Sequence, residues 1–495
     1  MAQTLSVLPA PFWVLMLVLA GGVLLGIGRI RDGLGLPLLA VLGTVGAWYV
    51  GDALYNNYAA NHAQLFPPEI LAAAWWQVVL FCGVFLVLAP SFHHWWSRRL
   101  IHQGSYAVYL FQHGPGDADL QQQLTLLFRV CAIVWAVLTV LGTLRLKGEI
   151  LYYFFPFLSY RADPWARGRV GAGIDFLLIA GSYLHLLVGA CFGVVAAVSK
   201  DKRIRFLALL GCALTWPYIA FGSARNYMLT VAVPGILAWV LLRVRAILPI
   251  KLALLAACFM AISLWLAFVI ANRSTTSVVE AAKEGAVLSE ETREARHEGL
   301  NMYEELCWIN SFIAEGSYEP NRGKRYWAEL VNPIPRTLWN GKPMIGIDYS
   351  VLRGQARDVG DDTEAAGVYA TISTGMIGQG VVNFGPYVGS AFAAALMAAW
   401  AAVLARFDLS GRKFGRIPLY GIGLMLTFNL GRDITFITLY PFVFGAALIW
   451  VIQRWERPAG DPAPERAPRK LRKKGRQGSL LQGLPKQSAP ETPQL

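Results

Sequence analysis

The residues of this chain that could do chemistry are cations standing outside its main basic clusters. Arg225, Arg336 and Arg432 are the leading candidates in this group, and Arg273 and Lys342 are further candidates. A guanidinium group stays charged at physiological pH and binds two phosphate oxygens at once. Arginines gathered at one membrane surface would suit a phosphate or diphosphate, and they could stabilise its growing negative charge without a metal ion. The alternative is that each arginine extends to lipid head groups or pairs with a nearby acid.

One polar segment places two of these cations in a stiff setting. It reads Asn332-Pro-Ile-Pro-Arg-Thr-Leu-Trp-Asn-Gly-Lys-Pro343 and holds three prolines and a tryptophan. Proline fixes its own φ angle and restricts the residue before it. The segment is therefore predicted to be a rigid basic element at the membrane surface rather than a flexible linker.

Acids that could serve as a catalytic base are few. Glu304, Glu305 and Asp433 are candidates, although none stands in a motif that identifies it. His297 could also act as a base, but a solvated helix face is the favoured interpretation. The carboxylates of residues 361–364 could bind a divalent ion, but a solvated turn is favoured there. We expect no metal ion and no cofactor, since the sequence has no Gly-rich phosphate loop and no Cys/His metal spacing.

Hydropathy predicts the elements that must position these groups. The 495 residues are 55% hydrophobic and 15% charged, whereas a soluble chain usually carries about 25% charged residues. Apolar runs of about 20 residues recur, and each can cross a hydrocarbon core of about 30 Å as a helix. The expected fold class is an all-α polytopic membrane protein with about 11 transmembrane helices. The predicted helices are 9–28, 34–53, 69–90, 127–145, 172–198, 204–222, 227–242, 248–270, 385–405, 417–430 and 434–452.

Basic residues predict the orientation of these helices. The first apolar run has no basic residue before it, and Arg29 and Arg31 follow it, so a retained helix with its N-terminus outside is expected. Further clusters occur in alternate connections, which the positive-inside rule assigns to the cytoplasm. They lie at 98–99, 200–205, 243–251 and 412–416. The net charge of +13 is therefore explained by membrane topology and does not indicate a nucleic-acid partner.

The predicted topology divides the chain into four parts. A membrane domain of eight helices precedes a large, partly helical extracytoplasmic loop, three further membrane helices and a basic, disordered cytoplasmic tail. The loop has 11 Lys/Arg and 16 Asp/Glu over residues 271–376, whereas the tail is basic and rich in Pro, Gln and Ser. The four parts are residues 1–270, 271–384, 385–455 and 456–495.

The large loop is predicted to contain a helix from Ser289 to about Ile313, because a capping hydroxyl and acidic residues open it. This helix would carry Leu300, Tyr303, Leu306 and Ile309 or Ile313 on one face. The loop is also rich in Tyr and Trp. Their rings could stack on sugars or lie at the membrane interface, and both interpretations stay open.

Three short motifs resemble those of a known family. The stretch Ile334-Pro-Arg-Thr-Leu-Trp-Asn-Gly-Lys-Pro343 resembles the Pro-Arg…Trp…Lys-Pro motif of the Wzy-type O-antigen and exopolysaccharide repeat-unit polymerases. The glycine-rich stretch 374–385, followed by Gly389, resembles the approach to their next membrane helix. Residues 222–226 resemble their Ser-Arg motif at an outer helix end. The resemblance covers about residues 170–434, and the first five helices match only by general hydropathy.

The resemblance implies a membrane glycosyltransferase fold of the GT-C type, in its polymerase/ligase branch. It implies a glycan carried on undecaprenyl diphosphate at the outer face of the bacterial inner membrane. The growing glycan would move to a hydroxyl of an incoming lipid-linked repeat unit, without a nucleotide sugar or a metal ion. Diphosphate binding carries over to Arg225, Arg336 and Arg432, and no catalytic base carries over. A chain-length regulator and a flippase are expected partners.

Other functions remain open at this stage. A ligase that moves finished glycan onto lipid A core or protein would share the architecture. A transporter of lipid-linked glycans or small molecules would favour inverted repeats, small outer loops and ionisable groups within helices. Asp175 and His185 are nearly the only such groups, and the outer loop is large. A purely structural assembly partner is the remaining alternative.

Overall fold

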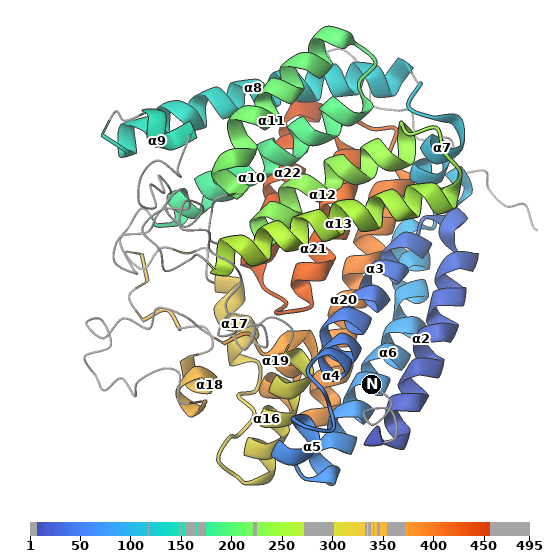
Figure 1. The fold of residues 1–495 in the computed structure, drawn as a ribbon, viewed down its shortest axis with the longest axis vertical. Coiled ribbons are helices and arrows are strands. Elements are labelled where there is room, and N and C mark those ends of the chain that lie inside the picture. The colour runs from blue at the N-terminus through green and yellow to red at the C-terminus, as the bar shows by residue number, and fades with distance from the viewer. Residues whose placement is uncertain are drawn as a thin grey trace, which may run out of the picture. The chain divides into compact units, whose positions relative to one another are not determined.

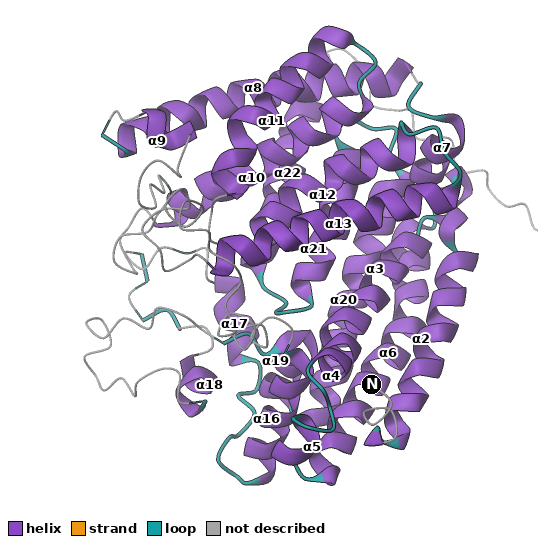
Figure 2. Ribbon diagram, viewed as in Figure 1, coloured by secondary structure: helices purple, strands orange, loops and turns teal. Residues whose placement is uncertain are grey.

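The computed structural model describes residues 7–116, 118–147, 150–154, 165, 175–220, 225–271, 301–331, 334, 338–339, 341–343, 347–353 and 372–455. Figure 2 shows helices joined by loops, and no strand occurs in these ranges. Six helical segments within them are long and apolar enough to cross a membrane. The chain is therefore an all-α, multi-pass membrane protein. The six segments are Ala10–Gly28, Gly35–Tyr55, Pro68–Ser97, Leu120–Arg145, Gly181–Val198 and Pro386–Leu409.

The long helices follow the apolar runs of the sequence (Figure 1). Each of the eleven predicted segments overlaps a helix, and six of these regions are long and apolar enough to cross a membrane. The largest extensions beyond the predicted bounds are in α6, which continues past Pro90, and in α8, which begins before residue 127. A proline within a membrane helix is tolerated where neighbouring groups satisfy the freed backbone. The helices are α2 (Ala10–Gly28), α3 (Gly35–Val45) with its continuations η2 (Gly46–Val50) and α4 (Gly51–Tyr55), α6 (Pro68–Ser97), α8 (Ala118–Arg145), α10 (Asp175–Val198), α11 (Lys202–Ala220), α12 (Arg225–Leu242), α13 (Leu248–Ala271), α20 (Pro386–Leu409), α21 (Arg416–Leu430) and α22 (Phe436–Trp455).

Shorter helices lie in the connections. The predicted loop helix does not run unbroken to Ile313, because Asn301 has a non-helical backbone and α16 begins after it. Residues 289–300 lie outside the described ranges. The shorter helices are η1 (Ile30–Asp32), α5 (His62–Leu65), η3 (Ile101–Gln103), α7 (Tyr106–His113), α9 (Ile150–Phe154), α16 (Met302–Ala314), α17 (Lys324–Val331), α18 (Ile347–Leu352) and α19 (Gly375–Phe384).

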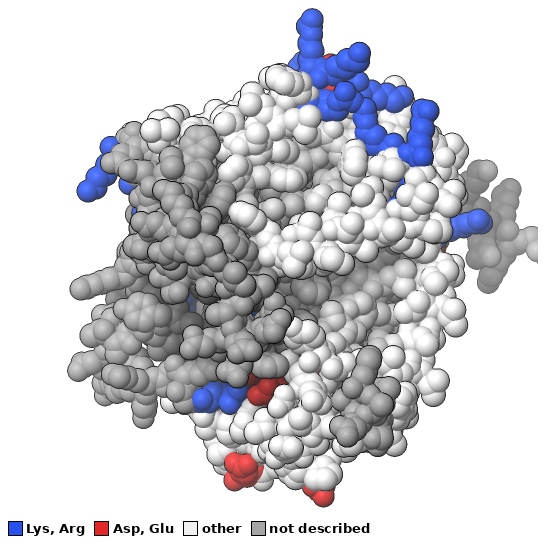
Figure 3. Space-filling model, viewed as in Figure 1, with Lys and Arg blue, Asp and Glu red and all other residues white. Residues whose placement is uncertain are grey.

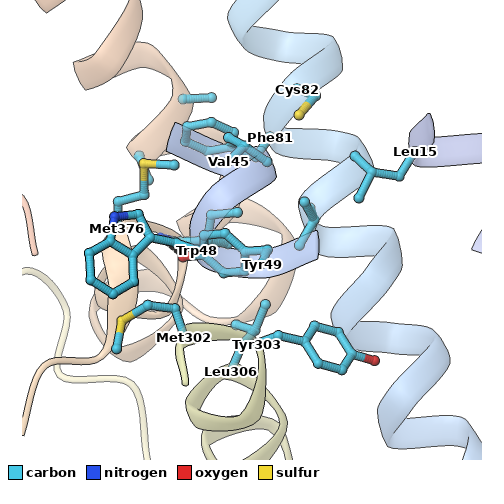
Figure 4. Close-up of a cluster of buried hydrophobic side chains, with 14 of the residues drawn as sticks. Leu15, Val45, Trp48, Tyr49, Phe81, Cys82, Met302, Tyr303, Leu306 and Met376 are labelled. Atoms are coloured by element: carbon cyan, nitrogen blue, oxygen red, sulfur yellow. Dashed lines mark hydrogen bonds between the residues drawn. The ribbon is translucent and has the colours of Figure 1, made fainter. Parts of the chain in front are cut away.

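Helix α16 anchors the large loop in the main hydrophobic core. Its predicted apolar face is confirmed, since Tyr303, Leu306 and Ile309 are all buried. Figure 4 shows Tyr303 and Leu306 in one cluster with Tyr49 of η2 and side chains of α2, α6 and α19. The large loop is therefore docked onto the membrane helices rather than hanging from them.

A buried carboxylate fixes the start of α16. Asp52 of α4 accepts hydrogen bonds at Oδ2 from the backbone N–H groups of Tyr303, at 2.8 Å, and Glu304, at 3.1 Å. The first N–H groups of a helix have no partner within the helix, and a negative charge there also matches the helix dipole. Asp52 therefore caps the N-terminus of α16, although it is distant in the sequence.

Backbone and side-chain bonds group one set of connections at the same end of the helices. Ser105 N–H donates to the Arg31 carbonyl oxygen at 2.9 Å, and Ala107 N–H donates to Asp408 Oδ1 at 2.8 Å. Lys200 N–H donates to Gln121 Oε1 at 2.7 Å. Figure 3 shows most of the coloured Lys and Arg side chains of this face gathered there, over α7, α8 and α11. We call this end the basic end.

A second set of described connections meets away from the basic end. Here α16 packs against α4, α6 and α19, and Met376 N–H donates to the Gly431 carbonyl oxygen at 3.0 Å. Acidic side chains are visible at this end, near α5 and α16 (Figure 3). We call it the loop end.

Candidate functional site

The structure describes the predicted diphosphate-binding cations to different extents. Arg336 and Arg273 lie outside the described residues. Arg225 is the first residue of α12, and only its backbone is described. Lys342 donates from Nζ to the Ile334 carbonyl oxygen at 2.9 Å, a contact within the proline-rich segment itself. Lys342 therefore helps to hold the turn of that segment.

The turn after α21 brings two predicted site residues to the segment before α19. Arg432 is exposed and donates from Nη2 to Ser373 Oγ at 2.9 Å. Asp433 accepts at Oδ1 from the Thr374 N–H at 3.2 Å and from Thr374 Oγ1 at 3.0 Å. The Arg-Asp pair of the turn thus joins the start of the glycine-rich stretch, which the sequence places almost 60 residues away.

A residue that the sequence interpretation missed completes this junction. Arg325 of α17 is 4% exposed, and its Nη2 lies 3.3 Å from Asp433 Oδ1. Burial raises the pKa of Asp433, while Arg325 and the Thr374 bonds oppose that rise. The Nε and Nη1 groups of Arg325 have no hydrogen-bond partner among the described residues. Arg325 therefore has two buried N–H-bearing nitrogens left for another acceptor.

A second missed residue lies one helical turn further along α17. Glu329 is 3% exposed, and its Oε2 has no hydrogen-bond partner in the described part of the chain. The pKa of Glu329 is raised to about 8, mainly by burial, while Arg325 lowers it and nearby Asp433 raises it. The four-residue spacing places Arg325 and Glu329 on one helix face. That spacing, directly before the proline-rich segment, was the available signal in the sequence.

These residues form what we call the acid–arginine cluster: Arg325, Glu329, Arg432 and Asp433. Its members come from α17 and from the turn between α21 and α22, and α17 packs against α19. The arrangement combines guanidinium nitrogens able to bind an anion with a carboxyl group able to exchange a proton near neutral pH. It therefore has the parts needed for an anionic leaving group and a proton transfer.

The two other candidate bases belong to a separate set of contacts. Glu305 is 1% exposed and forms a two-bond ion pair with Arg353, whose Nη2 lies 3.0 Å from Oε1. Tyr349 of α18 also donates to Glu305. Glu304 accepts at Oε1 from Trp308 Nε1 at 3.1 Å. Through these bonds Glu305 fastens α18 and Arg353 to α16, so it serves the structure.

Breaking this pair should loosen the docked loop without touching the acid–arginine cluster. We expect Arg353→Met to lower the free energy of unfolding by about 3 kcal/mol, because it leaves the Glu305 carboxylate buried and unpaired. The double variant Glu305→Gln/Arg353→Met should recover part of that loss. Thermal unfolding of the purified protein in detergent measures both, with Arg322→Met, an exposed site, as control. Equal melting temperatures for Arg353→Met and the control would contradict a structural ion pair.

Several remaining sequence predictions can also be placed. His185, one of the ionisable groups within the predicted helices, is buried and stacks on Tyr218 with ring centroids 5.1 Å apart. His297 and the acidic run 361–364 lie outside the described residues. Within the described ranges, no group of three or more His, Cys, Asp or Glu side chains is arranged to hold a metal ion.

Fold and site together define a multi-pass helical membrane protein with an ionisable cluster at its loop end. Comparisons with protein-family models, with curated proteins and with solved structures find no match to this chain. A functional proposal therefore starts from the residues of the cluster and their surroundings.

Proposed function

We propose that the chain polymerises oligosaccharide repeat units, carried on undecaprenyl diphosphate, into O-antigen or exopolysaccharide at the outer face of the bacterial inner membrane. The observation that carries this proposal is the acid–arginine cluster, where buried Arg325 keeps unpaired nitrogens beside Asp433 and Glu329. The finer fold proposed with it is GT-C-like, with eleven transmembrane helices, a cytoplasmic C-terminus and the loop end outside. The helices found at all eleven predicted positions support that number.

The location of the cluster suits a lipid-linked diphosphate. Such a group stays at the membrane surface because its polyprenyl chain stays in the hydrocarbon core. The cluster lies where a segment of the large loop, α17, meets the turn that joins two membrane helices. A site in this position can receive a head group from the bilayer and a sugar from the aqueous side.

The charges of the cluster suit a leaving diphosphate. In the proposed reaction an acceptor hydroxyl oxygen bonds to the anomeric carbon of the growing glycan, and the bond from that carbon to the phosphate oxygen breaks. The electron pair leaves with the diphosphate. Buried guanidinium groups stabilise this charge more strongly than exposed ones, because the low local dielectric weakens screening. Arg325 is buried and Arg432 is exposed beside it, so the two would bind inner and outer phosphate oxygens.

Two predicted arginines fit the same proposal by their position in the chain. Arg336 follows the end of α17 by five residues. Arg225 begins α12, which packs against α21, and Asn429 near the end of α21 donates to Thr230 Oγ1 at 3.4 Å. The backbone at Arg225 therefore lies at the loop end. Arg273 and Lys342 are further candidates for the rim of the site.

Lysine substitutions at these arginines test the function. Arg336→Lys and Arg225→Lys keep the charge but lose two-point binding of phosphate. We expect each variant to lose long-chain polysaccharide and to accumulate single lipid-linked repeats at a normal protein level. Gel analysis of the polysaccharide and extraction of the lipid-linked fraction measure this in cells.

The matched control is Arg412→Lys at the basic end, for which unchanged chain lengths are expected. Unchanged chain lengths in both Arg336→Lys and Arg225→Lys would overturn the diphosphate site. Accumulation of repeats that only a cytoplasmic reagent can reach would instead indicate a transporter, and loss of glycan transfer to lipid A core with normal polymer would indicate a ligase.

A further inference from the structure

The proposed reaction requires a group that removes the proton of the acceptor hydroxyl. Resting on the proposed function, we infer that Glu329 is this catalytic base and that Arg325 beside it stabilises the leaving diphosphate. One face of α17 would then carry both the group that accepts the proton and the group that binds the leaving diphosphate.

Both side chains are buried, and both keep polar atoms unpaired. Glu329 is 3% and Arg325 4% exposed, and neither Glu329 Oε2 nor Arg325 Nε and Nη1 has a hydrogen-bond partner among the described residues. Buried polar groups are almost always hydrogen-bonded, and an unpaired one costs about 1–3 kcal/mol. The two groups lie on one helix face, yet the only ion pair found for Arg325 within the described ranges is with Asp433. Atoms kept free at this cost point to a ligand that offers both an anion and a hydroxyl.

Other acids are poorer choices for the base. Asp433 already accepts bonds from Thr374 and Arg325, so it positions the guanidinium group. Glu305 is held by Arg353 and Tyr349. Glu329 Oε2, by contrast, is a buried acceptor atom with no partner in the described part of the chain, as a proton transfer needs.

The surroundings of Glu329 bring its pKa close to neutral pH, where a general base is effective. On α17 its ionisable neighbours are Arg325, the phenol of Tyr326 and the exposed Lys324. Helix α19, which packs against α17, carries no ionisable side chain over Gly375–Phe384, and Asp433 faces the cluster from the turn. Burial dominates and raises the Glu329 pKa to about 8. A general base works best when its pKa lies near the operating pH.

The step balances without any further reactant. The acceptor hydroxyl oxygen forms its bond to the anomeric carbon while the carbon–oxygen bond to the phosphate breaks. The hydroxyl proton passes to the Glu329 carboxylate, and the electron pair of the broken bond leaves on the diphosphate, where Arg325 binds it. Glu329 then returns its proton to water.

The test uses the full-length protein in liposomes with undecaprenyl-diphosphate-linked repeat units. We expect Glu329→Gln to lower kcat at least about 100-fold with little change in the donor KM, because general-base catalysis contributes about 10²–10⁴-fold. Glu329→Asp should recover part of the rate. The wild-type rate should rise with pH through about 8, and that rise should vanish in Glu329→Gln. The matched control is Glu319→Gln, an exposed acid in the same loop.

A melting-temperature series separates catalysis from folding. The raised pKa of Glu329 means that the unfolded chain ionises first, near pH 4.5, whereas the folded protein keeps the proton until about pH 8. Stability is therefore lost as the pH rises from about 4.5 through about 8. We expect Glu329→Gln to melt near the wild-type temperature at pH 5 and above it at pH 9. An inactive variant with this profile is folded.

The outcomes distinguish the inference from the function on which it rests. A wild-type protein that makes no polymer from lipid-linked repeats overturns the proposed function. A wild-type protein that polymerises, beside a Glu329→Gln variant within threefold of its rate and with the same pH profile, overturns only the assignment of Glu329.

Discussion

Replacing Arg325 by methionine is expected to abolish long-chain polymer, with a fall in transfer rate of about 100-fold to 1,000-fold. That range is typical for removal of one preorganised donor that stabilises a developing negative charge. Arg325 should lie near the top of it, because its guanidinium group is buried and retains two nitrogens without a described partner. Lysine at this position keeps the charge but loses the planar fork, so we expect Arg325→Lys to recover only a small part of the rate.

The methionine variant also disturbs the fold, and the design must separate the two effects. Without Arg325, the Asp433 carboxylate, which is 14% exposed, loses its ion-pair partner, which costs at most about 3–5 kcal/mol. The double variant Arg325→Met/Asp433→Asn removes the unpaired charge. We expect it to regain most of the lost stability in detergent while staying inactive, since the diphosphate still lacks its ligand.

The adjacent residue supplies the matched control. Lys324 is exposed at the start of the same helix, so Lys324→Met changes the net charge equally without altering the cluster. Its polymer length and melting temperature should equal those of the wild type. Recovery of both stability and polymerisation in the Arg325→Met/Asp433→Asn variant would show that Arg325 is only a structural partner of Asp433.

The membrane helices could be predicted because their signal is local. A run of about 20 apolar residues has few alternatives to a helix in a bilayer, and basic residues mark its ends. The predicted helix bounds were wrong where contacts with distant parts of the chain determine them. Helix α6 passes Pro90, which a sequence reading takes as a stop, and α16 begins at Met302 because Asp52, some 250 residues earlier, caps it.

The candidate site was predicted only in part, for a related reason. Arg432 stood out as a cation outside the main basic clusters, whereas Asp433 was only one of three candidate acids. Arg325 and Glu329 did not stand out, since they lie in a polar loop where charged residues are usually solvated. Their burial depends on α17 packing against α19, a contact between segments about 50 residues apart that no local pattern encodes. Arg325 and Glu329 become candidate site residues only because they are buried.

The glycine-rich stretch before α20, by contrast, was noticed in the sequence, and the structure explains why glycine is needed there. Gly385, with φ +81°, turns the chain between α19 and α20. Gly380 of α19 and Gly389 of α20 then face one another. A Cβ at Gly389 would overlap the carbonyl group of Gly380, and a Cβ at Gly380 would overlap that of Gly389. The obstructing atoms are backbone, so no side chain can move aside.

Gly389→Ala should therefore be among the most damaging single-methyl additions in the chain. Overpacking typically costs about 1–3 kcal/mol, and a clash with backbone should reach or exceed about 3 kcal/mol because a whole helix must shift. The helix that shifts is α19, which carries Gln379, bonded to both the N–H and the carbonyl oxygen of Ile434 beside Asp433. We expect a lower melting temperature in detergent and loss of long-chain polymer together.

Gly421→Ala is the matched control for that substitution. Gly421 lies within α21, and a Cβ there would meet nothing within 4 Å. Alanine is a better helix former than glycine by about 1 kcal/mol, so this variant should melt at or above the wild-type temperature and polymerise normally. The two variants add the same methyl group to a helix, and they differ in what that methyl meets. If Gly389→Ala melts with Gly421→Ala and still makes long polymer, α19 does not depend on the close approach of the two glycines, and its hold on the turn at Asp433 must come from elsewhere.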